Sequence, residues 1–341
     1  MVSEDGKRSF NVPGASGKKG LQLTTDYGAS WSTVSDTTVE SIAFTHGCGS
    51  LSLKYQWAFA QYNSYVRSTD YGKTWTSSNS LSGYKIVGSD ASQSGKHVVA
   101  YHYRNEGRVM VSSDYGVTWS ENLVVSYSDG FPGATYASQV FVSTSGKTMY
   151  IACNYFMYVS TDYGKNWNTQ YFKTVDEDSI YATGGFSVSK DAKSIMINAG
   201  HSSFYLSKDW GKTYTLHSIK ASSNMYGYFS SLSKSGEIVT VIGDSNLAMS
   251  VDHGLTWSLD PQDSFDDLDG TLFGAASWKI SADGSRMVCN IDLQDNNRFN
   301  IYSFATGYTD DSNQADDDDA TFNFEEVHSS RRSLESKNLR G

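Results

Sequence analysis

The chain has 341 residues, of which 14% are aromatic and 19% charged, with 30 Gly against 3 Pro. Its net charge of −10 is concentrated, because residues 260–326 contain 16 Asp or Glu against 3 Lys or Arg and the remainder is close to neutral. The sequence has no basic stripe and no run of about 18 apolar residues, so we exclude nucleic-acid binding through phosphates and insertion into a membrane.

Going along the chain, one string of the form S-x-D-x-G-x-(S/T)-W recurs, from TTDYGASW at Thr24–Trp31 to SVDHGLTW at Ser250–Trp257. Its aspartates lie 43 to 48 residues apart, which is the length of four short strands with their turns. The six aspartates are Asp26, Asp70, Asp114, Asp162, Asp209 and Asp252, and the aromatic residues that end the string are Trp31, Trp75, Trp119, Trp167, Tyr214 and Trp257.

A second turn sequence lies 19 to 23 residues before the aspartate. This turn sequence is SQSGK at Ser92 and matches only weakly at Gly47–Ser50. Its other copies begin at Ser3, Ser143, Ser189, Ser233 and Ser281. The copy at Ser281 predicts a seventh aspartate string near residue 305, where Ser303–Tyr308 has Ala305 in place of the aspartate. We interpret this as a degenerate seventh string and expect seven units, the first of which lacks its innermost strand.

These repeats predict an all-β fold, a β-propeller with four-stranded antiparallel blades. The second turn sequence favours seven blades, and the six intact strings leave six blades as the alternative. We expect residues 1–308 to form the propeller and residues 309–341 an acidic linker and C-terminal tail. Because an unpaired edge invites aggregation, residues 320–327, which alternate in polarity, are our candidate for a strand that closes the ring.

The aspartate string suits a tight turn. The Asp side chain can accept backbone N–H groups of its own turn, and the Gly supplies a positive φ. The Trp can bury its ring between sheets, which contributes about 2–3 kcal/mol. We therefore expect these aspartates to hold hairpins and not to catalyse a reaction.

The six strings resemble the Asp-box, or BNR, repeats of the sialidase superfamily, over about residues 3–308. The same motif occurs in xyloglucanase-type glycosidases, sortilin-type receptor ectodomains and photosystem II assembly factors. The resemblance implies a propeller whose Asp-boxes lie on the face opposite the ligand site. These families include enzymes and binding proteins, so the motif does not determine a chemistry.

No catalytic residue is assigned from the sequence. The resemblance to sialidases would imply three convergent arginines and an Arg-Ile-Pro-like start. No such start is present, and the small number of arginines in the propeller argues against a convergent triad. A glycosidase needs two carboxylates facing each other across the sugar. The loops offer Glu106, Asp129, Asp176, Glu177, Asp178, Asp244, Asp266, Asp267, Asp269, Asp292 and Asp295, for which solvated loop charge is the simpler interpretation. A glycoside hydrolase with a carboxylate pair in these loops stays the alternative function.

Aromatic and polar residues crowd the loops opposite the Asp-boxes, a composition typical of surfaces that bind glycans or proteins. Our candidate ligand-binding residues are Tyr84, Tyr136, Tyr181, Tyr228, Tyr103, Arg104, His201 and Arg298. The main functional hypothesis is therefore a non-catalytic recognition or assembly propeller that binds a glycan or protein partner on this loop face. The alternative for the tyrosines is packing between blades.

The remaining expectations concern cofactors and location. We expect no cofactor and no assigned metal site, although Asp267–Gly270 and Asp316–Asp319 have the composition of a calcium site. The cysteines Cys48, Cys153 and Cys289 should be free. We expect an extracytoplasmic protein, secreted, at the cell surface or in an organelle lumen, that is a monomer or one domain of a larger protein.

Overall fold

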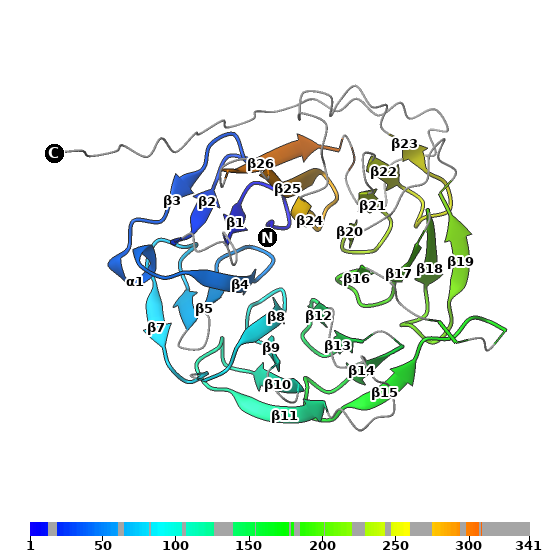
Figure 1. Cartoon of the computed structure of the whole chain (residues 1–341), viewed down its shortest axis with the longest axis horizontal. Helices are drawn as coiled ribbons and strands as arrows, with labels where there is room; N and C mark the ends of the chain where they lie inside the picture. Colours follow the sequence, from blue (N-terminus) through cyan, green and yellow to red (C-terminus); the bar gives the residue numbers. More distant parts are fainter. Residues whose placement is uncertain are drawn as a thin grey trace.

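The computed structural model describes the chain except for residues 13–18, 61–64, 82, 104–106, 126–138, 154, 177–178, 181–184, 201, 220–228, 243–246, 260–274, 294–297, 307 and 309–341. The described residues form seven antiparallel sheets that follow one another around a ring in chain order (Figure 1). The prediction of an all-β propeller is confirmed.

The first three sheets occupy the left and lower part of Figure 1. The first contains β1 (Ser9–Asn11), β2 (Gln22–Thr24) and β3 (Ser32–Thr33) and is followed by the short helix α1 (Thr37–Glu40). The second contains β4 (Phe44–Gly49), β5 (Gln56–Ala60), β6 (Tyr65–Ser68) and β7 (Thr76–Ser78). The third contains β8 (Ile86–Ala91), β9 (Val98–Tyr103), β10 (Gly107–Ser112) and β11 (Ser120–Val125).

The other four sheets complete the ring. The fourth contains β12 (Gln139–Val142), β13 (Met149–Ala152), β14 (Phe156–Ser160) and β15 (Asn168–Tyr171), and the fifth contains β16 (Phe186–Val188), β17 (Ile195–Gly200), β18 (Ser203–Ser207) and β19 (Thr215–Ser218). The sixth contains β20 (Phe229–Leu232), β21 (Val239–Ile242), β22 (Leu247–Ser250) and β23 (Ser258–Leu259), and the seventh β24 (Ala275–Ile280), β25 (Arg286–Leu293) and β26 (Arg298–Ala305).

The predicted strand number per blade holds for five of these sheets, and the first and last have three described strands each. In the first sheet the inner position holds only an isolated bridge between Val2 and Ser9 and a bond from the Met1 amino group to the Phe10 carbonyl (2.8 Å). After the last sheet, residues 309–341 are not among the described residues, and they include the proposed closing strand 320–327.

The hydrophobic core lies between consecutive sheets. One cluster joins Phe141 and Tyr150 of the fourth sheet to Phe186 and Ile195 of the fifth, and similar clusters fill the neighbouring gaps. Such side chains alternate along each strand because successive residues point to opposite faces of a sheet.

The aromatic residues of the Asp-boxes contribute to this core unequally. Trp75 (6% exposed) and Tyr214 (0%) are buried as expected. The other four, Trp31, Trp119, Trp167 and Trp257, are half-buried, which corrects the expectation that every box ring is enclosed between sheets. Each box ring comes immediately before the outermost strand, where one side of the sheet meets solvent.

Cys48 and Cys153 are buried and do not form a disulfide, and Cys289 lies in β25. Among the described residues, no helix has both the length and the apolar character that a membrane crossing requires.

Candidate functional site

Each Asp-box closes the turn between the two outermost strands of its sheet. In the third sheet the Asp114 carboxylate accepts hydrogen bonds from the Ser112 hydroxyl (2.8 Å), the Thr118 amide (2.9 Å) and the Thr118 hydroxyl (2.6 Å). The Ser112 hydroxyl in turn accepts from the Gly116 amide (2.8 Å). The same network forms around Asp26, Asp70, Asp162, Asp209 and Asp252.

These hydrogen bonds keep the box carboxylates ionised. The amide and side chain of Asn166, together with the Ser160 hydroxyl, lower the pKa of Asp162 to about 2. At Asp114 partial burial raises the pKa, but bonds from Thr118 and Ser112 outweigh it and the pKa is lowered. Because both carboxylate oxygens are engaged within the turn, the geometry of a box gives its aspartate a structural task.

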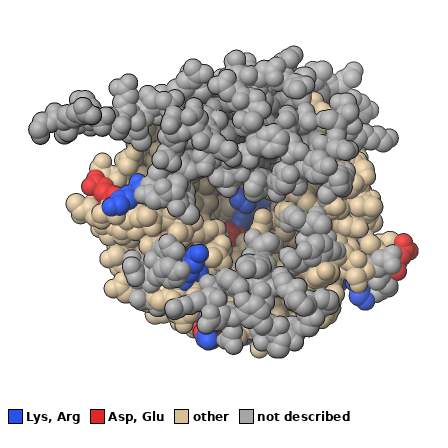
Figure 2. Space-filling view, viewed as in Figure 1, with Lys and Arg blue, Asp and Glu red and all other residues tan. Residues whose placement is uncertain are grey.

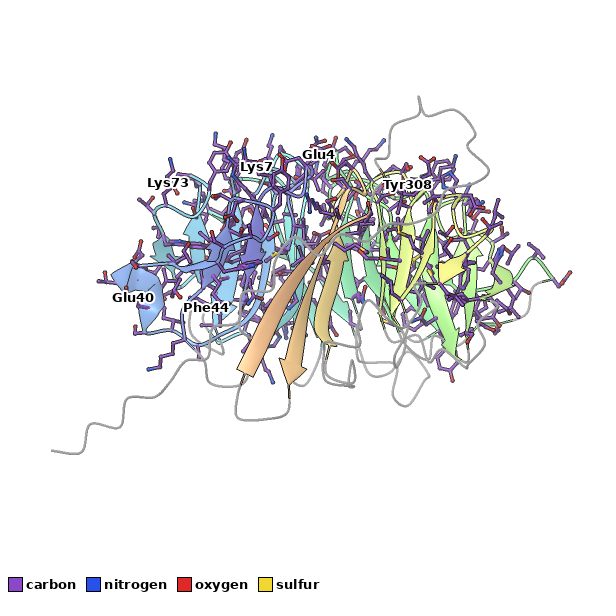
Figure 3. All side chains as sticks on the ribbon, turned by 90° about the horizontal axis from the view of Figure 1, so that it is seen from above. Glu4, Lys7, Glu40, Phe44, Lys73 and Tyr308 are labelled. Atoms are coloured by element: carbon purple, nitrogen blue, oxygen red, sulfur yellow. The ribbon has the colours of Figure 1, made fainter. Side chains whose placement is uncertain are left out.

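The residue after each box aspartate connects two turns of the same sheet. Tyr115 has a φ of 63°, and its amide donates to the Lys96 carbonyl of the second turn sequence (3.1 Å). In the last sheet the Thr306 amide makes the corresponding bond to the Ser285 carbonyl (3.0 Å), although Ala305 stands in the aspartate position. Both kinds of turn therefore lie on one face of the ring, the Asp-box face, where Glu4, Lys7, Lys73 and Tyr308 are labelled in Figure 3.

The loop face, at the opposite ends of the strands, contains the residues predicted to bind a ligand. Tyr84 is half-buried and lies edge-on to the His102 ring, with centroids 4.7 Å apart. Tyr84 packs against the core cluster between the second and third sheets, which agrees with the alternative that this tyrosine packs between blades. Tyr103 ends β9 and Arg298 begins β26, and the side chains of both lie outside the described part.

The other candidates on this face are not placed relative to one another. Tyr136, Tyr181, Tyr228, Arg104 and His201 lie outside the described residues, as do the calcium candidates Asp267–Gly270 and Asp316–Asp319. Within the described part of the chain, no group of three or more His, Cys, Asp or Glu side chains could hold a metal ion.

The centre of the ring contains a feature that the sequence interpretation missed. The innermost strands β4, β8, β12, β16, β20 and β24 surround the axis, and Figure 2 shows a hollow there with basic and acidic side chains inside it. Each second turn sequence begins with a serine, and the residue two positions before that serine lies near the inner edge of its sheet. We call these seven residues, one from each sheet, the channel ring. Its members are Met1, Cys48, Asp90, Phe141, Ser187, Ser231 and Lys279.

Asp90 is the acidic member of the channel ring and is fully paired. Its two carboxylate oxygens accept from the Lys190 ammonium (3.0 and 2.8 Å), and one also accepts from the Val142 amide (2.8 Å). The side chains of Lys190 and Asp90 are 21% and 19% exposed. The same ammonium lies 4.9 Å from the centre of the Phe141 ring. Asp90 thus joins the inner edges of the third, fourth and fifth sheets.

Lys279 is the basic member of the channel ring and lies on β24. Its side chain is exposed to solvent and makes no ion pair or hydrogen bond with any described residue. The inner strands around Lys279 partly shield it from water and lower its pKa, although the side chain reaches solvent in the channel; nearby Asp90 counteracts this effect and the Lys190 charge adds to it. The channel therefore contains one ammonium group without a counterion in the described structure.

His46 lies on β4, the innermost strand of the second sheet. Its Nε2 accepts a hydrogen bond from the Ser89 amide (3.0 Å), and burial lowers its pKa to about 4. His46 is therefore neutral near pH 7. With His46 neutral, Lys190 and Lys279 against Asp90 give these channel side chains a net charge of +1.

Ring topology and repeated turns together define the class of this protein, a β-propeller of the Asp-box type. The chain carries BNR/Asp-box repeats, and residues 157–170 match the family model described as the BNR-Asp box repeat. A search of curated protein sequences found no match.

Several solved structures share the fold. A GH74 enzyme of Niastella koreensis has a TM-score of 0.63 and 14% identity, over 96% of this chain and 53% of that one, so the chain spans about half its length. YCF48 of Cyanidioschyzon merolae has a TM-score of 0.57 and 16% identity, over 85% and 90% of the two chains. The β-propeller domain of Myceliophteria thermophila Cps50 (Swd1) has a TM-score of 0.58 and 11% identity, over 89% and 95%. At these identities the similarity shows the fold alone.

Proposed function

We propose that this protein is a non-catalytic recognition or assembly propeller that binds a protein or glycan partner through its loop face and central channel. The observation that carries the proposal is the channel ring, where Lys279 has no counterion among the described residues while Asp90 is paired with Lys190. A solvent-accessible ammonium inside a channel, with no counterion beside it, attracts a ligand that supplies the opposite charge. On the Asp-box face, by contrast, the carboxylates of the box aspartates already accept hydrogen bonds within their own turns.

A similar fold with a bound protein segment supports this proposal. A structure described as YCF48 bound to a D1 peptide resembles the chain with a TM-score of 0.56 and 15% identity, over 84% of this chain and 88% of that one. We infer that a protein segment is the first partner class to test here, and that glycans are the second.

We also infer that the ring has seven blades, counting each described sheet as one. Backbone bonds between second turn sequences support this number. Among the described residues they join every pair of neighbouring sheets except the second and third, and one of them runs from the Asp283 amide in the seventh sheet to the Glu4 carbonyl in the first (3.1 Å). An experimental structure with six radial repeats would contradict it.

Peptide and glycan arrays probed with the full chain would test the binding function. Lys279→Ala should weaken the captured interaction by tenfold or more, whereas Lys96→Ala, an exposed lysine on the Asp-box face, should leave it unchanged. Capture that both variants or neither variant impairs would contradict binding through the channel and loop face.

The alternative is a glycoside hydrolase, which the similarity to the GH74 enzyme keeps open. Release of reducing sugar from a polysaccharide, abolished by Asp178→Asn, Asp244→Asn or Asp292→Asn, would replace the binding proposal with this one. We further propose that the protein acts outside the cytoplasm. Detection of the native protein in the cytoplasmic fraction would contradict that location.

A further inference from the structure

We propose that the central channel contains a carboxylate-binding site formed by the Lys279 ammonium and the Ser231 hydroxyl. This inference rests on the proposed recognition function and names the ligand chemistry that the channel selects. The two residues belong to the sixth and seventh sheets and occupy equivalent positions of the channel ring.

Ser231 and Lys279 are held next to each other by a bond between sheets. The Ile280 amide, which follows Lys279 in the chain, donates to the Ser231 Oγ (3.1 Å). A serine hydroxyl can accept and donate at the same time, and among the described residues no group accepts the Ser231 hydroxyl proton. Ser231 is 5% exposed, so this donor is buried beside a solvent-exposed ammonium. A buried donor without an acceptor is costly, and a bound anion removes that cost.

The same two positions in the third and fourth sheets hold Asp90 and Phe141, and there a carboxylate is paired with an ammonium that comes from the fifth sheet. There Asp90 accepts from the Val142 amide at the position of Ile280, and the Lys190 ammonium neutralises it. A carboxylate, an amide and an ammonium therefore already form one compact group inside this channel. In the sixth sheet Ser231 stands at the position of Asp90, so a hydroxyl and the Lys279 ammonium occur there without a carboxylate side chain from the ring.

Charge and shape favour a single carboxylate over a more highly charged anion. The described channel side chains sum to +1, which one carboxylate neutralises and a phosphate dianion would exceed. Lys279 is the fifth residue of β24, so at about 3.3 Å per residue it lies about 13 Å from the first residue of that strand. A group entering from the loop face has this distance to cover, whereas the Ser281 turn on the Asp-box face lies only two residues from Lys279. An acidic side chain or a small free acid is suited to either route.

The enclosure of Lys279 agrees with this site. Burial and the Lys190 charge lower its pKa, and Asp90 offsets part of the effect. A bound carboxylate would stabilise the charged ammonium, so ligand binding should raise the pKa of Lys279 and slow its reaction with acylating reagents.

The experiment titrates the full chain with acetate, succinate and a blocked tetraglutamate peptide at constant ionic strength. Binding is followed by NMR shifts of the Lys279 side chain and by mass-spectrometric measurement of lysine acylation. Carboxylates should protect Lys279 from acylation and leave the exposed Lys96 unprotected. If the peptide binds at least tenfold more tightly than succinate, the source is an acidic protein segment, and the reverse order indicates a free acid.

Three variants at the site separate this proposal from a general charge effect. Lys279→Met should weaken binding at least tenfold, Lys279→Arg should keep it within about threefold, and Ser231→Ala should weaken it severalfold. Asp90→Asn, which leaves Lys190 without its counterion, should tighten it at least threefold. Lys96→Met is the matched control, and unchanged melting temperatures would show that each variant is folded.

The possible failures are distinguishable. If a macromolecular partner binds but Lys279→Met and Asp90→Asn leave its affinity and carboxylate binding unchanged, the channel site is wrong and the recognition function stands. If carboxylates bind as described but no array partner is found, the site stands and the recognition function fails. Equal protection of Lys279 and Lys96 overturns the channel site.

Discussion

At the scale of single residues, the box aspartates act through the number of hydrogen bonds they accept. Asp114 takes bonds from two amides and two hydroxyls, which a tight turn cannot satisfy with its own carbonyls. This explains why Asp was expected in a structural role from the sequence alone: a short acceptor at a fixed distance from Ser and Gly is a local requirement.

The first prediction removes this acceptor. Asp114→Ala removes the acceptor of the Thr118 amide and hydroxyl and leaves the Val117 amide only its longer bond to the carbonyl of residue 114 (3.3 Å), so the free energy of unfolding should fall by about 1–2 kcal/mol. Asp114→Asn keeps one oxygen acceptor and should cost less than half as much. Chemical denaturation of the three proteins measures this, and equal losses for Ala and Asn would show that charge, not hydrogen bonding, holds the turn.

A second prediction follows from the lowered pKa of Asp162, about 2 in the folded chain. The pKa of an unfolded Asp is about 3.9, so the unfolded chain takes up the proton first as pH falls. The stabilisation is therefore complete above about pH 4 and is lost as pH falls towards 2.

Melting temperatures between pH 5 and pH 2 check this prediction. Asp162→Asn has no proton to bind, so its melting temperature should depend less steeply on pH than that of the unmodified protein. Asp176→Asn, at an exposed loop aspartate, is the control and should keep the original slope. Identical slopes for all three proteins would contradict the assigned pKa.

At the scale of elements, the turns of the Asp-box face connect neighbouring sheets. The Thr144 amide of one second turn sequence donates to the Lys190 carbonyl of the next (2.8 Å). Ring contacts add to this, because the Arg8 guanidinium lies 4.7 Å from the Tyr71 ring centre and Arg286 lies 4.9 Å from that of Tyr27. The last pair joins the seventh sheet to the first.

The sequence was sufficient for the elements because their causes are local. Period, turn residues and alternation predicted the order of strands and turns within each unit, including a degenerate box at Ser303–Tyr308, where the Thr306 amide bonds to the Ser285 carbonyl. The channel ring has no such local cause: Asp90, Ser231 and Lys279 differ in residue type and come together through ring closure. Aligning the repeats by position, and not by residue type, would have brought these residues to attention.

The third prediction concerns the turn at which the seventh sheet meets the first. Gly6 has a φ of +68°, and an added Cβ would lie 2.5 Å from the Arg286 Cβ. Gly83 has a φ of +88° with open space around it, so Gly83→Ala costs only backbone strain. Gly6→Ala should therefore destabilise the fold by about 1–3 kcal/mol more than Gly83→Ala. Equal losses of unfolding free energy would mean that this junction is not closely packed in solution.

At the scale of the whole molecule, the question is how a ring made from one chain stays closed. The first and seventh sheets are joined by the Asp283 amide and Glu4 carbonyl and by the Lys234–Glu4 ion pair (2.8 Å). The two side chains of the pair are 42% and 41% exposed, so the ion pair contributes less than about 1 kcal/mol. Neither contact replaces the ladder of hydrogen bonds that a shared strand would provide.

The last prediction tests whether a late segment supplies that strand. Both sheets at the junction have three described strands, so each has an edge that a further strand could cover. If residues 320–327 take this place, deleting residues 309–341 exposes an edge and should lower the melting temperature by about 3 °C, which corresponds to about 2 kcal/mol. Deleting residues 329–341 spares the segment and should leave the melting temperature unchanged. An unchanged melting temperature after both deletions would mean that the turn contacts between Arg286, Tyr27, Asp283 and Glu4 close the ring without a shared strand.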